Sequence, residues 1–335
     1  MEGADVSAVW LRSSLDSLPG PDLDAGDATR ARASDILRPA GALARLDEVA
    51  AWAAEWQGSH RPAVRRPAAL VFAADHGVTA AGVSRYPADV TAAMLTAYRA
   101  GRSTISAFAA VAGAQVSAID VGVGRPTGDI RYEPAMSPER FDEAVAAGRG
   151  AVEALDADIL VLGEMGIGNT TAAAAVAAAL GGGEVAAWVG RGTGVDDAGL
   201  DRKREAVREA VMRVAGVLDP LEVLREVGGA ELAAMTAAIV AARLRRLPVI
   251  IDGYVVTAAA LPLHSMRADA LDHCLVGHCS AEPGHRRLLQ RLAKEPLLDL
   301  EMRLGEGSGA MAALPLVAMA CAGVTDVPTF GEWFG

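Results

Sequence analysis

The sequence predicts an α/β protein in which repeated βα units surround a parallel sheet, and two observations support this fold class. From residue 67 onward, short apolar runs alternate with alanine-rich stretches of helical length, as strands and helices do around such a sheet. The composition is 52% hydrophobic but only 4% aromatic, so we expect closely spaced helices that pack on a flat apolar layer. Both features are typical of α/β enzymes.

The expected elements follow one another in a simple order. A polar segment with Pro and Gly comes first and contains a helix over about residues 42–57. Beyond Pro67 the apolar runs predict strands, and a helix that starts near Pro138 separates the second run from the third. After Arg291 the alternation stops, and a last apolar helix follows the segment MRLGEGSGA. The expected strands lie in ALVFAADHG, QVSAIDVGVG, DILVLGEMGIG, EVAAWVGRGTG, PVIIDGYV and DHCLVGHCSAEPG.

The length of 335 residues allows one large domain or a large domain with a small appendage. We expect the second arrangement, with the two ends of the chain packed together as a small helical lobe. The expected parts are an N-terminal helical segment over 1–66, a large α/β domain over 67–291 with the floor of the site, and a C-terminal segment over 292–335.

Charge and composition exclude several classes of partner. The net charge of −11 argues against binding to nucleic acid or to an anionic membrane, because either needs a basic face. The longest apolar stretch, Ala310 to Val324, is shorter than the roughly 20 residues of a membrane span, and no basic segment precedes an apolar core at the N-terminus. Three cysteines do not make a disulfide framework in a chain this long. We therefore expect a soluble cytoplasmic protein.

The ends of the apolar runs predict where a site would lie. Nearly all of these runs end in glycine and polar residues. Ligands of an open parallel sheet bind outside the carboxyl ends of its strands, so we expect these ends to form one continuous floor.

The stretch LVLGEMGIGNTTAAAA predicts an anion site, because a buried strand passes through Gly163, Gly166 and Gly168 into a helix near Thr170. Glycine lets a ligand approach the free amides of a helix N-terminus, which hold phosphate. The loop is neither a Walker loop nor the dinucleotide fingerprint. Taken alone, these glycines could equally serve only a tight turn.

A second loop, VGRGTGVDDAGLDRK, repeats this design and adds Arg191 and Lys203, which favours a phosphorylated ligand. Asp196 and Asp197 could indicate a magnesium-dependent, diphosphate-releasing transferase. They follow glycines rather than an apolar strand, so we favour capping and solvated residues of a helix that starts near Asp197.

Two His-Cys pairs invite a zinc site, but alternation along a strand sends Cys274 and His278 to one face and His273 and Cys279 to the other. No second cluster supplies further ligands, so buried strand residues are the favoured interpretation. His76, in ADHGV, is expected to be an orienting polar residue. No nucleophile elbow is present, and chemistry would depend on carboxylates.

Six motifs in order resemble one known family, that of nicotinate-nucleotide:dimethylbenzimidazole phosphoribosyltransferase. They are FAADHGVTAAGVSRYPADVT, LGEMGIGNTTAAAA, GRGTGVDDAGL, PVIIDGYVVTAAAL, GHCSAEPGH and MRLGEGSGA, and the resemblance covers the chain from about Leu70 to Leu316. The resemblance implies a Rossmann-like sheet with a small lobe from both termini, acting as a homodimer without metal or cofactor. It also implies transfer of phosphoribosyl from nicotinate mononucleotide to 5,6-dimethylbenzimidazole, giving α-ribazole 5′-phosphate and nicotinate in cobalamin assembly.

The resemblance also implies roles for individual residues. Glu306 matches the general base that removes the benzimidazole N–H proton, and Glu164 matches an acid that lines the ribose site, where a carboxylate would stabilise positive charge. Around the phosphate the matching residues are Gly166, Gly192, Lys203, Ser280 and Arg303, with Gly168 in the same loop. Near the incoming base they are Asp75, Ser84, Tyr86 and Leu304.

One departure affects the acceptor. Family members often carry glutamine where VTAAML has Ala92 and Ala93, so a transferase with an adenine or phenolic acceptor stays open. A non-catalytic nucleotide-binding protein is the other alternative, although Glu306 is present. We expect the glycines that flank Glu306 to leave room for a flat heterocycle and a ribose. A helix N-terminus lowers the pKa of such an acid and burial raises it, so the direction is open.

Overall fold

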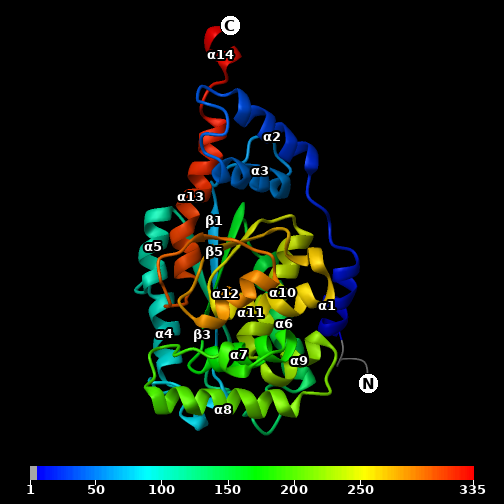
Figure 1. Cartoon of the computed structure of the whole chain (residues 1–335), viewed down its shortest axis with the longest axis vertical. Coiled ribbons are helices and arrows are strands. Elements are labelled where there is room, and N and C mark those ends of the chain that lie inside the picture. The colour runs from blue at the N-terminus through cyan, green and yellow to red at the C-terminus, as the bar shows by residue number, and fades with distance from the viewer. Residues whose placement is uncertain (1–5) are drawn as a thin grey trace.

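The computed structural model describes residues 6–335 and confirms the predicted α/β class. Its centre is a six-stranded, entirely parallel sheet in the order β2-β1-β3-β4-β5-β6 (Figure 1). The strands are β1 Pro67–Ala74, β2 Gln115–Gly122, β3 Ile159–Met165, β4 Val249–Ile251, β5 Cys274–His278 and β6 Pro296–Leu298.

Both faces of the central strands are buried, which explains their continuous apolar runs. Along β3, Leu160 and Leu162 join the core on one face, and Ile159 and Val161 join the core on the other. The first face packs against α6 Pro138–Glu153, α7 Asn169–Gly181, α10 Ala230–Leu244 and α11 Tyr254–Met266. The second packs against α3 Arg45–Gln57, α5 Thr104–Ala112 and α13 Ser308–Thr325.

The remaining elements lie around these two layers. They include α4 Val90–Arg99, α8 Asp197–Arg213, α9 Pro220–Val227 and α12 Pro283–Arg291, with 3-10 turns at Gly77–Ala81, Val185–Ala187 and Ala268–Leu271.

The expected strand in EVAAWVGRGTG is wrong. Residues 185–187 form a 3-10 turn, in which the Trp188 N–H donates to the Val185 carbonyl, and the indole N–H of Trp188 donates to Gly182. The N–H groups of this segment thus donate to nearby carbonyls instead of to a neighbouring strand. The sixth strand is instead β6, in a segment where we expected no strand. Three residues at the sheet edge carry too little pattern for recognition from sequence.

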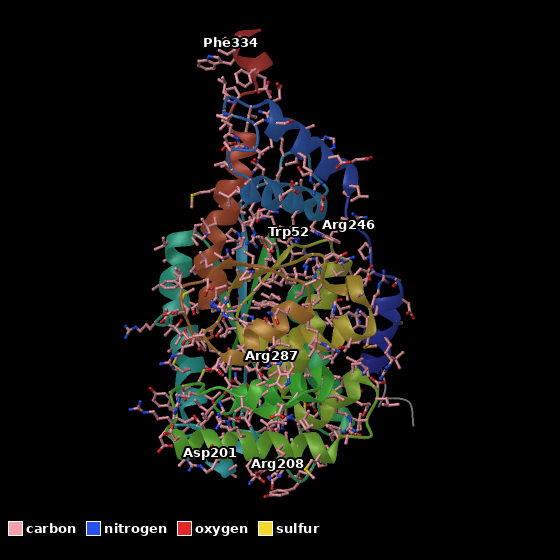
Figure 2. All side chains as sticks on the ribbon, viewed as in Figure 1. Trp52, Asp201, Arg208, Arg246, Arg287 and Phe334 are labelled. Atoms are coloured by element: carbon pink, nitrogen blue, oxygen red, sulfur yellow. The ribbon has the colours of Figure 1, made fainter. Side chains whose placement is uncertain are left out.

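A small lobe extends from one end of the sheet (Figure 1). It contains α2 Leu23–Asp35, α3, the far end of α13 and α14 Phe330–Phe334. An ion pair between Arg32 of α2 and Glu332 of α14 links the N-terminal and C-terminal parts of this lobe. The segment 1–66 is divided, because α1 Val6–Asp16 packs against α6 and α10 instead. In Figure 2, Trp52 lies where the lobe meets the large domain, and Phe334 lies at the tip of the lobe.

Among the described residues, α13 is the one helix long and apolar enough to span a membrane. Of its apolar window, 56% is buried against the rest of the fold, as in the core helix of a globular protein.

The strand order places a topological switch point between β1 and β3. The chain runs from β1 to β2 on one side and then returns to β3 on the other side of β1. Crevices at such points, outside the carboxyl ends of the strands, are where ligands bind. Asp75 and His76 follow β1, and Gly166 follows β3.

Candidate active site

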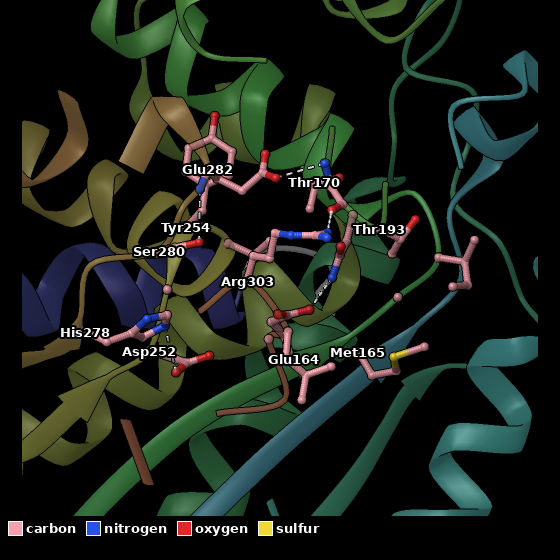
Figure 3. A pocket seen from close by; sticks show the side chains of 18 residues that line it. Glu164, Met165, Thr170, Thr193, Asp252, Tyr254, His278, Ser280, Glu282 and Arg303 are labelled. Atoms are coloured by element: carbon pink, nitrogen blue, oxygen red, sulfur yellow. Dashed lines mark hydrogen bonds and ion pairs between the residues drawn. The ribbon is translucent and has the colours of Figure 1, made fainter. Parts of the chain in front are cut away.

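A cavity opens at the carboxyl edge of the sheet, between the ends of β3, β4 and β5 (Figure 3). The loop 191–194 and the segment 303–305 border it on the other sides. The residues predicted from the sequence that line it are Glu164, Gly166, Gly192, Ser280, Arg303 and Leu304.

Other predicted residues lie outside this lining. Gly168 has a φ of +96° and is the residue before α7, so it shapes the helix start. Asp75 accepts a hydrogen bond from the Gly124 amide at 2.7 Å. Ser84 accepts one from the Tyr86 amide at 3.2 Å, and the Tyr86 side chain is exposed. Of the residues predicted for the acceptor, only Leu304 therefore lines this cavity.

The second glycine loop is tied to the cavity by two charged side chains, the buried Glu282 and the exposed Arg303. The Gly192 amide donates to Glu282 at 2.8 Å, and Arg303 donates to the Gly192 carbonyl at 3.0 Å. In Figure 3 the Arg303 side chain crosses the cavity between Glu282 and Glu164. A guanidinium in this place can bind an anion.

Lys203 lies behind the two loops and connects them. Its side chain is 1% exposed, and Nζ donates to the Thr170 hydroxyl of α7 at 2.8 Å. Burial lowers the pKa of Lys203 to about 8, although the charge of Glu282 acts in the opposite direction. An ammonium so placed has lost much of its hydration and gains strongly from an anion bound nearby.

The paired aspartates behave as the sequence predicts. Asp196 caps α8 by accepting from the Gly199 amide at 2.7 Å, and α8 begins at Asp197. Asp197 is exposed and pairs with Arg191. Their interpretation as capping and solvated residues is confirmed.

Glu164 is a buried carboxyl group at the end of β3. Burial is the largest cause that raises its pKa to about 8, followed by the charges of Asp252 and Glu231. A hydrogen bond from the Asn169 amide acts in the opposite direction. Glu164 is thus held close to the balance between its protonated and ionised forms near neutral pH.

Glu306 has an unusual backbone conformation. Its φ is +65°, and Gly305 and Gly307 on either side have φ of +86° and +84°. A left-handed conformation costs a non-glycine residue about 1–2 kcal/mol, and such strain is common at functional sites. Three residues in succession therefore turn the chain sharply into α13.

The glycines that flank Glu306 pack closely on the protein, and Gly305 also lines the cavity, so the expectation that they leave room for substrate stays a prediction. A Cβ atom at Gly305 would meet a carboxylate oxygen of Glu164 at 2.5 Å, and one at Gly307 would meet Ile105 at 3.0 Å. The glycines are needed for their positive φ and for close packing on the protein itself. The contact of Gly305 with Glu164 does bring the two predicted acids onto adjacent segments.

Glu306 is 6% exposed and is not among the residues that line the cavity. Burial is the largest cause that raises its pKa, and the charge of Asp252 adds to it. The Ile105 backbone and the Tyr98 hydroxyl act in the opposite direction. The sequence left the direction of this pKa shift open, and in the structure burial decides it. Oε2 of Glu306 has no hydrogen-bond partner among the described residues.

Sequence reasoning missed several residues that the fold brings to the site. Asp252 and His278 both line the cavity and lie 3.4 Å apart. His76 has a buried partner, Glu231, at 2.6 Å and 155 residues away along the chain. A signal existed for Asp252, because it directly follows a predicted strand. None existed for Glu231, which lies in an alanine-rich helix.

All four residues of the His-Cys pairs are buried, and among them His278 lines the cavity. His273 contacts the Ile239 carbonyl at 3.0 Å, and its ring packs edge-on against Trp56. Within residues 6–335, no group of three or more His, Cys, Asp or Glu side chains could hold a metal ion.

This fold and site are those of an enzyme class in which a parallel sheet carries glycine-rich loops suited to a phosphorylated ligand, with carboxyl groups beside them. The chain matches the family described as phosphoribosyltransferase over residues 18–333, and it belongs to that family.

Similar proteins carry a more specific name. A relative from Cereibacter sphaeroides, named nicotinate-nucleotide–dimethylbenzimidazole phosphoribosyltransferase, is 48% identical over 99% of this chain and 98% of its own length. A protein of the same name from Ruegeria sp. is 49% identical over 96% of this chain and 95% of its own. The crystal structure of CobT from Thermus thermophilus superposes on this chain with a TM-score of 0.88 and 43% sequence identity. The match covers 92% of this chain and 98% of the CobT chain.

Proposed function

We propose that the protein transfers phosphoribosyl from nicotinate mononucleotide to 5,6-dimethylbenzimidazole, giving α-ribazole 5′-phosphate and nicotinate for cobalamin assembly. The observation that carries this proposal is the meeting of two glycine loops, a buried lysine and two buried carboxyl groups at one edge of the sheet. The similar proteins named for this activity support it.

The donor would occupy the cavity with its phosphate toward the two loops. Arg303, the Lys203 ammonium and the amides at the start of α7 supply the positive charge that a phosphate dianion needs. Nicotinate leaves from a cationic pyridinium, so the C1′–N bond breaks with its electrons on a neutral ring nitrogen. Departure of this group needs no metal.

The acceptor would enter beside Leu304 and Gly305, next to Glu306. One ring nitrogen forms the new bond to C1′, and the proton of the other passes to Glu306. The free, buried Oε2 of Glu306 supports this role, and the raised pKa strengthens it as a base. Glu164, when ionised, would stabilise the positive charge that develops on the ribose.

The departure from the family at Ala92 and Ala93 lies away from the cavity. Both residues are on the exposed side of α4. On the buried side, Thr91 accepts a hydrogen bond from the Ile167 amide, and the Tyr98 hydroxyl acts to lower the pKa of Glu306. Dimethylbenzimidazole therefore stays the proposed acceptor, and adenine and phenols are included as competing acceptors in the test.

We also propose that the protein is a cytoplasmic homodimer. Exposed apolar side chains on α5, including Phe108 and Val111, support an interface, and three free buried cysteines suit a reducing compartment. Light scattering coupled to size exclusion tests the oligomeric state, and cell fractionation tests the location.

The activity is tested by incubating purified protein with nicotinate mononucleotide and each base, and by measuring nicotinate release by chromatography. We expect release with dimethylbenzimidazole and α-ribazole 5′-phosphate as co-product. Glu306→Gln should lower kcat by about 100- to 10,000-fold, as for loss of a general base, and leave nucleotide affinity nearly unchanged. Tight binding without release for any base would instead support the non-catalytic alternative.

A further inference from the structure

Asp252 lies at the carboxyl end of β4, directly beneath the start of α13, and is 1% exposed. Its Oδ1 accepts from the Ala310 amide at 2.8 Å, and its Oδ2 accepts from the Gly307 amide at 3.2 Å. These amides belong to the turn that follows Glu306. One carboxylate therefore binds both of them and closes the first turn of α13 onto the sheet.

His278, at the end of the neighbouring strand β5, supports the same turn. Its Nε2 is 3.4 Å from Oδ1 of Asp252, and the two side chains meet in the cavity (Figure 3). A Cβ atom at Gly309 would stand 2.0 Å from the imidazole ring. The helix start thus rests against His278 and is held by Asp252, so two strands fix its position.

We propose that Asp252, supported by His278, is the positioning residue that holds the strained Glu306 turn against the substrate cavity. The inference rests on the proposed function, since it assigns the support for the base of that reaction. The reason is mechanical. Glu306 has positive φ between two positive-φ glycines, and a strained turn of this kind persists only where its surroundings hold it.

Asp252 also sets the electrostatic environment of both acids. It interacts with Glu164 on β3, Glu306 before α13 and His278 on β5. Two further titratable groups face these acids: Tyr98 on α4 faces Glu306 and Glu164, and Glu231 on α10 faces Glu164. The negative charge of Asp252 raises the pKa of both Glu164 and Glu306. Removal of this charge lowers both pKa values, which distinguishes Asp252 from a residue with only a structural role.

The test variant is Asp252→Asn, with Asp219→Asn as a matched control. Asp219 also caps a helix by accepting two amides, those of Leu221 and Glu222 at the start of α9, and does not line the cavity. The anchoring itself is measured by hydrogen–deuterium exchange. We expect Asp252→Asn to exchange faster than wild type over residues 305–312. Asp219→Asn should exchange faster over residues 219–224 and not over 305–312. Unchanged exchange over 305–312 would overturn the proposed anchoring, whatever reaction the protein catalyses.

The second measurement is kcat/KM against pH in wild type and both variants. Asp252→Asn should lower kcat by about 100-fold, as for misplacement of a reacting group by 1 Å. It should also move the acid limb of the kcat/KM profile to lower pH, because the pKa values of both acids fall. Asp219→Asn should stay within about twofold of wild type. An unmoved acid limb with an equal loss at every pH would assign Asp252 a structural role only. Should Asp252→Asn not fold, Asp252→Ser carries the same predictions.

The outcomes separate this inference from the proposed function. If wild-type protein released no nicotinate, the proposed function would be refuted. Hydrogen–deuterium exchange would still show whether Asp252 anchors the Glu306 turn. Wild-type release together with an unaffected Asp252→Asn variant would refute only the positioning role.

Discussion

Gly163→Ala tests whether the packing of β3 against the Glu306 turn sets the reaction rate. Gly163 has ordinary extended backbone within β3, so alanine causes no strain of its own there. Its Cβ, however, would stand 2.2 Å from the Glu306 carbonyl oxygen and 2.6 Å from the Gly307 nitrogen. Ordinary contact begins at 3.4 Å, so the turn must retreat by about 1 Å.

A shift of this size in a reacting group costs about 100-fold in rate, equivalent to about 2.7 kcal/mol of transition-state stabilisation. The assay is kcat for nicotinate release at saturating substrates, with nucleotide affinity measured by calorimetry. We expect kcat to fall and the affinity to stay near wild type, because the nearest atoms to the added methyl group belong to the Glu306 turn.

Gly148→Ala is the matched control for overpacking. A methyl group there would stand 1.9 Å from the Ala234 carbonyl, between α6 and α10 and away from the cavity. Both variants should lose about 1–3 kcal/mol of stability, measured by thermal unfolding, but only Gly163→Ala should lose turnover. Wild-type kcat in a folded Gly163→Ala protein would refute the reasoning, as would equal losses of kcat in the two variants.

Two further predictions concern charge. Glu164 has a pKa of about 8 in the fold, above its ordinary value, so its contribution to stability is complete below about pH 4.5 and is lost as the pH rises toward 8. Glu164→Gln should therefore flatten the fall of Tm across this range in calorimetry, and an unchanged slope would contradict the raised pKa. Lys203 has a pKa of about 8, so the KM for nicotinate mononucleotide should rise above that pH. Below about pH 8, where the wild-type lysine is charged, Lys203→Met should raise this KM by about 10- to 100-fold, as for loss of a charge-assisted hydrogen bond, and a wild-type KM would exclude a phosphate role.

Much of the fold follows from local pattern. Continuous apolar runs that end in glycine and polar residues predict buried parallel strands, and five of the six runs are strands in the structure. The failure at residues 185–187 and the missed β6 are both short segments whose state depends on neighbours far along the chain. The position of α1 against α6 and α10 is of the same kind.

The site shows the same division. The glycine loops, the acid in MRLGEGSGA and the capping aspartates are recognisable because each depends on a few adjacent residues and their backbone geometry. Hydrogen-bond partners across long sequence separations are not, as the pairing of His76 with Glu231 and the two amides bound by Asp252 show.

The sequence by itself therefore determined the class of fold, the loops at the strand ends and the identity of the acid at the start of the last long helix. Tertiary structure alone decided what surrounds that acid. The glycines beside Glu306 have positive φ and pack closely on Glu164 and Ile105, contacts that only folding brings about. The direction of its pKa shift was also decided there, because desolvation depends on atoms that only folding brings together.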